Sequence, residues 1–376
     1  MKVLVLFTYE ISLKIWDNSG LLDRETKLYK EISKNSDVTY IFLTFGDKKD
    51  FEYRNNLVNI EIIPIYDYIN KSSLRVVNII KSFFVPLLLK KVFVESDILK
   101  SNQLNGSWIL LIAKLLYKKP IYIRTGFNLY EFAQKNKKGR FQKLFYLNLT
   151  RFALKQSDLY SVTSQKDKDN LINLFPKINK EIAVRPNWVT VDKYSNLENR
   201  FEKKLLCVGR LEKQKNFPAL FKVIENLNLE LDIIGDGTQK EELSKLKDKL
   251  GLSVNFISPM TNSELLSSYK KYKFFILSSK FEGNPKVLLE AMGAGCIVIG
   301  NNIDSIIEII TNKKDGFIFD FEVGTSSHFM NIIDEKFKTL QLISETAHKK
   351  ILDNNSFDNY LDNEKNDYNV LIKSPA

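Results

Sequence analysis

Short β-branched runs alternate with longer helical patterns along nearly the whole chain of 376 residues. In the first half, the runs expected to be strands are residues 2–7, 38–44, 60–65, 98–100, 120–124 and 159–163. Helix-sized segments lie between them, for example residues 21–34 and 106–117. Strands that alternate with helices in this way pair in parallel, and the helices cover both faces of the sheet. The alternation therefore predicts an α/β fold.

The alternation loosens over residues 177–202 and then restarts, which indicates a second domain. The second-half strands are expected at residues 205–208, 229–234, 254–257, 274–277 and 296–299. At ~150 residues per domain, the chain length also suggests two domains. We expect a Rossmann-like N-terminal domain over residues 1–190 and a second doubly wound domain over residues 191–355. A polar tail over residues 356–376 would pack back on the first domain or fray.

Composition excludes several classes of protein. No apolar run approaches the ~18 residues that span a bilayer, and the opening run 3–7 is too short for a signal-peptide core. The two cysteines, Cys207 and Cys296, exclude a disulfide scaffold and a four-cysteine zinc site. The default expectation is a cytoplasmic protein.

The excess of positive over negative charge is confined to the first half of the chain. The whole chain carries a formal charge of +11. Residues 1–190 hold 31 Lys and Arg against 18 Asp and Glu, whereas residues 191–376 hold 25 against 27. The excess is either drift in a lysine-rich composition or a surface that faces nucleic acid or a membrane. The motifs of RNA-binding sheets, in which aromatic and basic residues interleave, are missing, so we expect no nucleic-acid partner.

Three strand-end segments of the second half carry residues suited to binding a ligand, which such sheets hold at the carboxyl ends of their strands. In the first segment, Gly209 directly follows a strand and is joined by the cations Arg210 and Lys215. Arginine makes forked contacts with phosphate oxygens and lysine acts as a point charge, although solvated surface cations are the commoner case. In the second, Gly235 and Gly237 follow a strand, which indicates close approach of a ligand or simply a tight turn.

The third segment, residues 278–295, combines a loop with the start of a helix. Pro285 suits the first turn of that helix, because its missing N–H would lack a partner there. The amides at Gly283 and Asn284 then lie at the positive end of the helix, which favours phosphate.

Two glutamates of this segment are candidates for sugar contacts. Glu290 lies five residues beyond Pro285, ~7.5 Å along a helix axis, a distance that fits a ribose beside a diphosphate. It stands between Leu289 and Ala291, where an unpaired carboxylate would be costly. Glu282 precedes the helix and is free to meet whatever lies beyond the phosphates.

These segments, in this order and spacing, resemble the donor-binding half of the GT4-type retaining glycosyltransferases (glycosyl transferases group 1) of the GT-B fold. Glu282 and Glu290 match the E-x7-E motif of that family, and Gly209–Arg210 with Lys215 match its Gly-Arg…Lys pair. The match covers residues 203–320. In the first half the resemblance rests on Gly20, after a strand, and on residues 185–189, which are similar to a Pro-Asn-Gly-Val linker with Trp in place of Gly.

The resemblance implies two Rossmann-like doubly wound domains that face each other across a cleft. It implies an enzyme that moves a sugar from a UDP- or GDP-linked donor, with retention and without a metal or other cofactor, to a glycan or lipid-linked acceptor in bacterial surface polysaccharide synthesis. A hexosyl or N-acetylhexosaminyl group would be transferred; the sequence names neither the sugar nor the base. The alternative function is a non-catalytic GT-B partner or chaperone subunit, which would be expected to lose Arg210, Lys215 or Glu290.

Carried over residue by residue, the resemblance gives each motif a role. Arg210 and Lys215 would bind the diphosphate and stabilise the leaving group. Glu290 would hold the ribose, and Glu282 would touch the donor sugar. The remaining donor-binding residues would contribute backbone contacts: Gly209, Gly235, Gly237, Gly283, Asn284, Pro285 and Gly20.

One family feature is missing from the first half. Many members place a histidine after a strand of the first domain, but this chain has only His328 and His348, both in the second half. The corresponding strand end reads Arg124–Thr125, so one of these residues would take its place, or Arg124 would read an anionic acceptor group. Residues 75–93 and 135–143 combine cations with apolar residues. Either stretch could rest on anionic lipids, which would place the enzyme on the inner face of the cell membrane, although a helix packed on the sheet explains 75–93 equally well.

Overall fold

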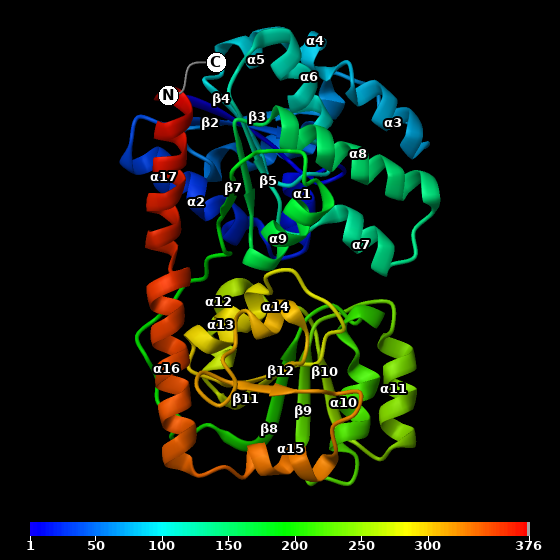
Figure 1. Cartoon of the computed structure of the whole chain (residues 1–376), viewed down its shortest axis with the longest axis vertical. Helices are drawn as coiled ribbons and strands as arrows, with labels where there is room; N and C mark the ends of the chain where they lie inside the picture. The colour runs from blue at the N-terminus through cyan, green and yellow to red at the C-terminus, as the bar shows by residue number, and fades with distance from the viewer. Residues whose placement is uncertain (374–376) are drawn as a thin grey trace. The chain divides into compact units, whose positions relative to one another are not determined.

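The computed structural model describes residues 1–373, which divide into two compact units (Figure 1). The first unit contains residues 1–185 and the chain from Leu361 onward, and the second contains Pro186–Tyr360. The division lies a few residues before the boundary expected at residue 190, and the last helix, α17 (Phe357–Lys373), ends in the first unit. Within residues 1–373, none of the helices is long and apolar enough to cross a bilayer.

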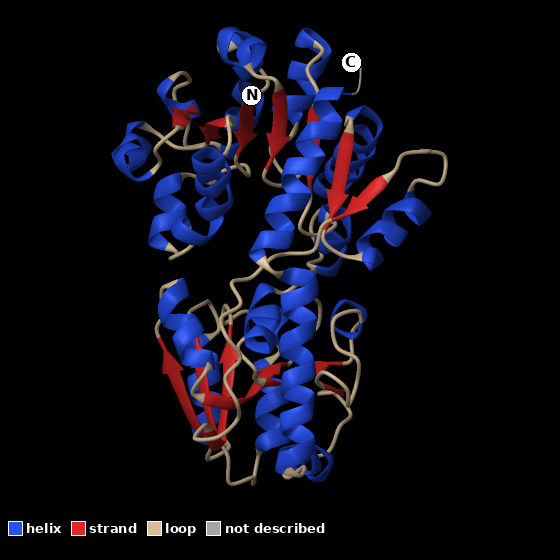
Figure 2. Cartoon of the chain, turned by 90° about the vertical axis from the view of Figure 1, so that its left-hand side faces the viewer, coloured by secondary structure: helices blue, strands red, loops and turns tan. Residues whose placement is uncertain are grey.

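The first unit is built on a seven-stranded parallel sheet in the order β3-β2-β1-β4-β5-β6-β7. Its strands are β1 (Lys2–Leu6), β2 (Thr39–Thr44), β3 (Ile60–Pro64), β4 (Ile98–Ser101), β5 (Ile121–Arg124), β6 (Leu159–Val162) and β7 (Ile182–Val184). The helices of this unit are α1 (Leu13–Asn18), α2 (Leu22–Asn35), α3 (Arg75–Ser82), α4 (Val85–Leu88), α5 (Lys90–Glu95), α6 (Trp108–Tyr117), α7 (Leu129–Lys135), α8 (Arg140–Gln156) and α9 (Gln165–Leu174). Figure 2 shows these helices packed against the strands.

The second unit repeats the plan with six parallel strands in the order β10-β9-β8-β11-β12-β13. Its strands are β8 (Phe201–Val208), β9 (Glu230–Ile234), β10 (Ser253–Ile257), β11 (Tyr272–Leu277), β12 (Ile297–Asn301) and β13 (Phe317–Phe319). Its helices are α10 (Phe217–Ile224), α11 (Lys240–Lys249), α12 (Asn262–Tyr269), α13 (Lys286–Gly293), α14 (Asp304–Ile307), α15 (Ser326–Ile333) and α16 (Phe337–Asn355). This is the doubly wound arrangement: the chain winds from β8 outward to β10 and then returns to β11 on the other side of β8.

The expected α/β fold and both doubly wound domains are confirmed, as are all the strands expected from the sequence to within a few residues. Two short strands, β7 and β13, were not expected. Each is only three residues long and lies in polar or irregular sequence, where a period-two pattern cannot be recognised. Burial on both faces explains the strong signal of the other strands: every residue of β11 is buried.

A buried ion pair anchors α17 to the sheet of the first unit. Lys100 of β4 pairs with Glu364 of α17, and each side chain is only 1% exposed. The Lys100 ammonium also lies 5.0 Å from the ring centre of Tyr122 and 5.4 Å from that of Tyr29. Burial lowers the pKa of Lys100, and the Glu364 carboxylate opposes that effect. Because a single charge left in this position would be costly, the pair fixes α17 on the sheet.

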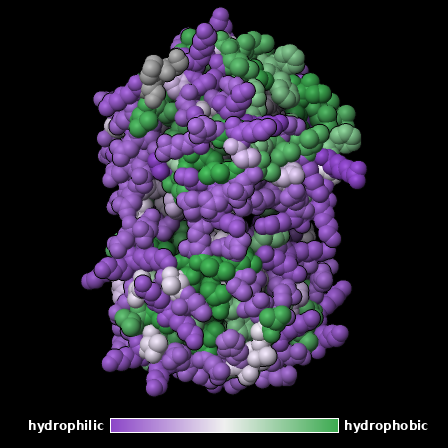
Figure 3. Space-filling model, in the orientation of Figure 1, coloured by the Kyte–Doolittle hydropathy of each residue, from purple (hydrophilic) through white to green (hydrophobic). Residues whose placement is uncertain are grey.

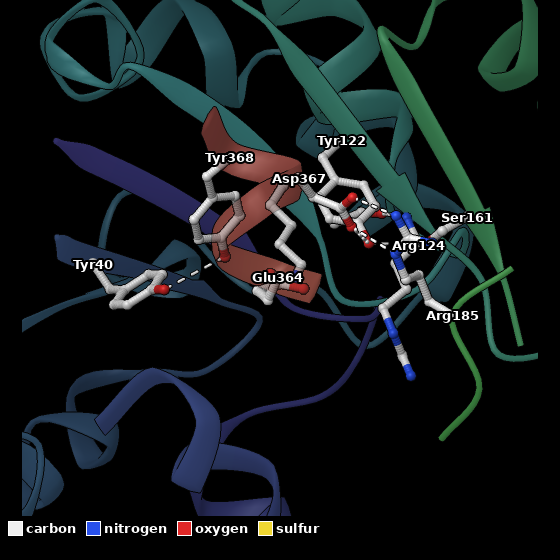
Figure 4. Close-up of polar contacts among 10 residues, drawn as sticks. Tyr40, Tyr122, Arg124, Ser161, Arg185, Glu364, Asp367 and Tyr368 are labelled. Carbon is white, nitrogen blue, oxygen red and sulfur yellow. Dashed lines mark hydrogen bonds and ion pairs between the residues drawn. The ribbon is translucent and has the colours of Figure 1, made fainter. Parts of the chain in front are cut away.

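Further polar contacts extend this anchor toward β7 (Figure 4). Asp367 accepts two hydrogen bonds from the Arg185 guanidinium, at 2.6 and 3.0 Å, and one from the Tyr122 hydroxyl at 3.3 Å. The Tyr40 hydroxyl donates to that of Tyr368 at 3.5 Å. These side chains come from α17 and from the strands of the first unit, so the polar tail expected at residues 356–376 is an ordered helix as far as Lys373.

Candidate active site

The three strand-end segments lie side by side at the carboxyl edge of the second sheet. Gly209 follows β8, Gly235 follows β9 and Ser278 follows β11, and these three strands are neighbours in the order β9-β8-β11. The order of the strands reverses between β8 and β11, so the loops after them diverge from the sheet there. This is the place where doubly wound sheets bind ligands.

The glycines at this edge let two backbone loops come together. A Cβ atom at Gly235 would lie 2.0 Å from the Gly209 carbonyl oxygen, and one at Gly237 would lie 2.6 Å from that of Leu211. Backbone hydrogen bonds join the same loops, from the Gly209 N–H to the Ile234 carbonyl at 3.0 Å and from the Leu211 N–H to that of Asp236 at 2.9 Å. Gly209 and Gly235 both have a φ of 154°. Close packing of the two loops is therefore sufficient to require Gly235 and Gly237, and their contact with a donor stays a prediction.

Lys215 and Glu282 meet in an ion pair. The Lys215 ammonium lies 2.7 Å from a Glu282 carboxylate oxygen, and the side chains are 14% and 10% exposed. Gln214 supports the pair, because its amide donates to the Phe281 carbonyl at 2.8 Å and to Glu282 at 3.4 Å. The Ser278 hydroxyl donates to the Lys215 carbonyl at 2.8 Å. The loops after β8 and β11 thus hold a cation and a carboxylate together at the edge of the sheet.

Arg210 follows Gly209 in the loop after β8 and is exposed. The neighbouring Glu212 accepts hydrogen bonds from the Thr238 N–H at 3.1 Å and from its hydroxyl at 2.9 Å. These bonds lower the pKa of Glu212. The carboxylate of Glu212 is therefore engaged with the β9 loop, and the Arg210 guanidinium contributes to the lowering of its pKa.

The loop before α13 is held by a residue that the sequence did not single out for the site. The Asn187 backbone N–H donates to the Asn284 side-chain oxygen at 2.9 Å, and the Asn187 amide donates to the Asn284 carbonyl at 2.7 Å. Asn187 in turn accepts a bond from Asn355 at 2.9 Å. Pro285 is the residue before the first turn of α13 rather than within it, with φ −72° and ψ 107°. Partly buried Gly283 lies in the same loop. The Pro-Asn linker pattern was the available signal for Asn187.

Glu290 is more enclosed than the sequence suggested. It lies in α13 and is only 2% exposed, and the Tyr269 hydroxyl donates to its carboxylate at 3.2 Å. Tyr269 is itself fully buried at the end of α12. A protein partner therefore offsets part of the cost of burying this carboxylate, and the ribose contact stays a prediction.

The residues expected on the acceptor side lie in the first unit. Arg124 ends β5 and Thr125 follows it, buried, with its N–H bonded to the Ser161 carbonyl at 2.9 Å. Gly20 has a φ of 68° and follows the end of α1, where the Leu21 N–H bonds to the Trp16 carbonyl at 2.8 Å. This bond is typical of a helix C-terminus closed by glycine. Gly20 therefore lies between the end of α1 and the start of α2.

The histidines and cysteines have structural surroundings. The His348 imidazole lies 2.7 Å from the Gly293 carbonyl, and Thr325 caps the helix that carries His328. Burial raises the pKa of Cys296 to about 12, as expected of an inert thiol. Cys207 is equally buried. Across residues 1–373, no group of three or more His, Cys, Asp or Glu is arranged to hold a metal ion.

Comparison with known proteins identifies the second unit. Residues 189–335 match the family model of the glycosyl transferases group 1. This match covers most of the second unit, Pro186–Tyr360. A UDP-Gal:α-D-GlcNAc-diphosphoundecaprenol α-1,3-galactosyltransferase of Escherichia coli is 26% identical over 79% of this chain and 84% of its own length. An N-acetylgalactosaminyltransferase of Campylobacter jejuni, named for a diphosphoundecaprenol-linked acceptor, is 27% identical over 69% of this chain and 71% of its own.

Solved structures agree on the fold. The Anabaena protein Alr3699/HepE, in a complex with UDP and glucose, superimposes with a TM-score of 0.73 over 98% of this chain and all of its own, at 16% identity. Sucrose-phosphate synthase from Thermosynechococcus elongatus gives a TM-score of 0.78 over 99% of both chains, at 10% identity. The two-domain Rossmann-like fold of this chain is thus the GT-B fold.

Proposed function

We propose that this protein transfers a sugar from a nucleotide diphosphate sugar to a glycan or lipid-linked acceptor in the synthesis of a bacterial surface polysaccharide. The observation that carries the proposal is the Lys215–Glu282 pair at the carboxyl edge of the second sheet, with the exposed Arg210 in the same loop as Lys215. Two cations at a strand-order reversal suit a diphosphate. The carboxylate suits the hydroxyl groups of a sugar.

In this proposal the second unit holds the donor. Arg210 and Lys215 neutralise the diphosphate, and the backbone amides around Gly283 and Asn284 add contacts from the N-terminal end of α13. Lys215 exchanges part of its interaction with Glu282 for the phosphate oxygens, and Glu282 turns to the donor sugar. Glu290 is assigned to the ribose, and the Tyr269 hydroxyl holds its carboxylate in place from within α12.

The proposed reaction breaks the bond between the sugar C1 and the diphosphate oxygen. The acceptor hydroxyl oxygen forms a new bond to C1 on the same face, and its proton passes to the departing phosphate. Negative charge develops on that phosphate in the transition state, and Lys215 and Arg210 stabilise it there. We propose retention of configuration and, because these cations carry the charge, a reaction without a divalent metal.

The acceptor is proposed to meet the first unit. Arg124 and Thr125, at the carboxyl end of β5, are the residues assigned to that side, and Gly20, also in the first unit, is assigned to the donor. Relatives in E. coli and C. jejuni are named for acceptors that carry a diphosphoundecaprenol group. By analogy, a lipid-linked acceptor at the inner face of the cell membrane is the proposed class for this chain. A role as a non-catalytic partner subunit is not favoured, because all three charged residues of the donor motifs are present.

A transfer assay tests the proposal. The full chain is incubated with UDP- and GDP-linked hexoses and N-acetylhexosamines and with polyprenyl-diphosphate-linked N-acetylhexosamine acceptors, and products are followed by mass spectrometry. We expect one donor to add one sugar unit, in the presence of EDTA as in its absence, with an α linkage from an α-linked donor by NMR. If the chain binds nucleotide but no combination of donor and acceptor yields free nucleotide or an elongated acceptor, the non-catalytic role is favoured.

A further inference from the structure

The helix α3 in the first unit buries polar side chains and exposes apolar ones, the reverse of a helix that packs on a core. Its buried residues are the polar Asn78 and Ser82, whereas Val76 is 66% and Ile80 55% exposed. The Asn78 side chain bonds to the backbone N–H and carbonyl of Ser72 at 2.7 and 2.8 Å. A surface helix normally turns its apolar stripe toward the core. Ile79 packs against the core of the first unit, whereas the side of α3 that carries Val76 and Ile80 is free for something outside the chain.

The exposed apolar side chains continue through α4. Val85 and Pro86 of this short helix are buried, but Leu87 and Leu88, and Phe84 just before the helix, are each more than half exposed. Seven large apolar side chains within residues 74–88 are exposed by 37–66%: Leu74, Val76, Ile80, Phe83, Phe84, Leu87 and Leu88. Single exposed apolar residues need no explanation, but a contiguous patch marks an interaction site.

Aromatic contacts join this patch to the start of α8. Phe83 stacks on Trp108 with 6.1 Å between ring centres, and Trp108 contacts Phe145 at 5.8 Å. On α8, Phe141 is 92% exposed and Leu144 55%. We call the exposed side chains of residues 74–88 and 141–145 the apolar surface. Figure 3 shows hydrophobic side chains gathered over this part of the first unit.

The charges around the apolar surface have one sign. Between Asp67 and Glu95 the chain has five Lys and Arg and no acidic residue, and between Glu131 and Asp158 it has seven and none. Arg75 is engaged with Glu10 at 2.9 Å. Residues 136–140, beside the apolar surface, are all exposed, and the cations among them are Lys137, Lys138 and Arg140.

We propose that the apolar surface lies in the headgroup region of an anionic bilayer, with the flanking cations on the lipid phosphates. Exposed Leu, Ile and Phe beside Lys and Arg, without acidic residues, are the side chains that bind such an interface. A second copy of the chain is a poorer occupant, because a two-fold interface would place like charges opposite one another. The position of the surface in the first unit also accounts for the basic half of the sequence. The inference goes beyond the proposed function, because lipid binding is measured without donor or acceptor.

Vesicle flotation with the full chain tests this inference. Vesicles of phosphatidylethanolamine and phosphatidylglycerol are compared with vesicles of phosphatidylcholine. The variant F84S/L87S/L88S removes apolar side chains from the surface, and V323S/L342S/L352S is the matched control, since these three residues are equally exposed in the second unit. A third variant, K137Q/K138Q/R140Q, removes flanking charge. The melting temperature and its shift with UDP and GDP check that each variant is folded.

We expect the wild-type chain and the control variant to float with anionic vesicles. The apolar variant should bind at least about tenfold more weakly at any salt concentration, because binding scales with the apolar area that is buried. The charge variant should lose binding mainly at low salt, where the wild-type gains it. Unchanged flotation of the folded apolar variant would overturn the proposal. So would the absence of wild-type flotation together with concentration-dependent dimerisation that F84S/L87S/L88S abolishes, which would assign the surface to a second copy.

Discussion

At the scale of single residues, the ion pair of Lys215 and Glu282 is the feature that most directly links this structure to chemistry. The two charges are largely buried, and Gln214 and Ser278 hold their loops in place. A pair in this setting is costly to keep unless it serves a ligand or a network. We therefore expect the pair to be remodelled when a diphosphate binds.

Substitution of Lys215 tests this role. In Lys215→Ala we expect turnover of the donor to fall about 10²–10³-fold, the effect of removing one group that stabilises developing negative charge. The measurement is kcat with saturating acceptor. Lys213→Ala is the matched control, because Lys213 lies in the same loop, is exposed and has no ion pair among the described residues. Equal activity of both variants would contradict the assignment.

Gly235 has a role that depends on the absence of a side chain. In Gly235→Ala the new methyl group would collide with the Gly209 carbonyl, 2.0 Å away, so one of the two loops must move. We expect a lower melting temperature and loss of the shift that nucleotide diphosphates produce. Gly251→Ala is a control for the loss of glycine alone, because a Cβ there meets open space, although its φ of 63° adds strain. A normal nucleotide response in Gly235→Ala would show that the loops tolerate the displacement.

At the scale of elements, the start of α13 depends on its tie to the segment before β8. Asn187 makes two hydrogen bonds to Asn284, and each contributes about 0.5–1.5 kcal/mol net. Only the amide-mediated bond is lost in Asn187→Ala, so we expect a small loss of stability in urea titrations but a clear rise in the Kd for the nucleotide. An unchanged Kd would mean that the loop before α13 does not contact the donor.

The anchor of α17 predicts an asymmetric mutant series. Glu364→Gln leaves the Lys100 charge buried without its counter-ion, so we expect it to lower the free energy of unfolding by about 3–5 kcal/mol. The double variant K100M/E364L removes both charges and should cost much less. Urea denaturation of the full chain gives the three values. A double variant as unstable as Glu364→Gln would contradict the view that the unpaired charge carries the cost.

The sequence foretold elements more reliably than contacts. Strands buried on both faces produce continuous apolar runs, so β1, β9 and β11 could be recognised, whereas three-residue β7 and β13 could not. The residues of the donor motifs come together at one edge as predicted. The contact of Tyr269 with Glu290 could not be assigned, because the two residues are distant in sequence and no local pattern encodes such a pair. For Asn187 the linker pattern marked the segment but not its partner Asn284.

At the scale of the whole molecule, the charge division agrees with the two units. The first half of the chain is basic and carries the apolar surface, and the second half is near neutral and carries the candidate donor site with only a few local cations. The sequence left residues 75–93 open between a core helix and a membrane contact. Three short helices occupy that stretch, which combines both features: Val85, Leu89 and Phe93 are buried in the core, whereas other apolar side chains of α3 and α4 are exposed.

Calorimetric titration of the full chain with nucleotides tests the central claim, that the second unit binds a nucleotide diphosphate through the loops after β8 and β11. We predict that UDP or GDP binds to the wild-type chain, that the corresponding monophosphate binds much more weakly, and that Lys215→Ala loses most of the difference while Lys213→Ala retains it. If neither diphosphate binds to the wild-type chain, or if Lys215→Ala binds it as tightly, the account of this site is wrong.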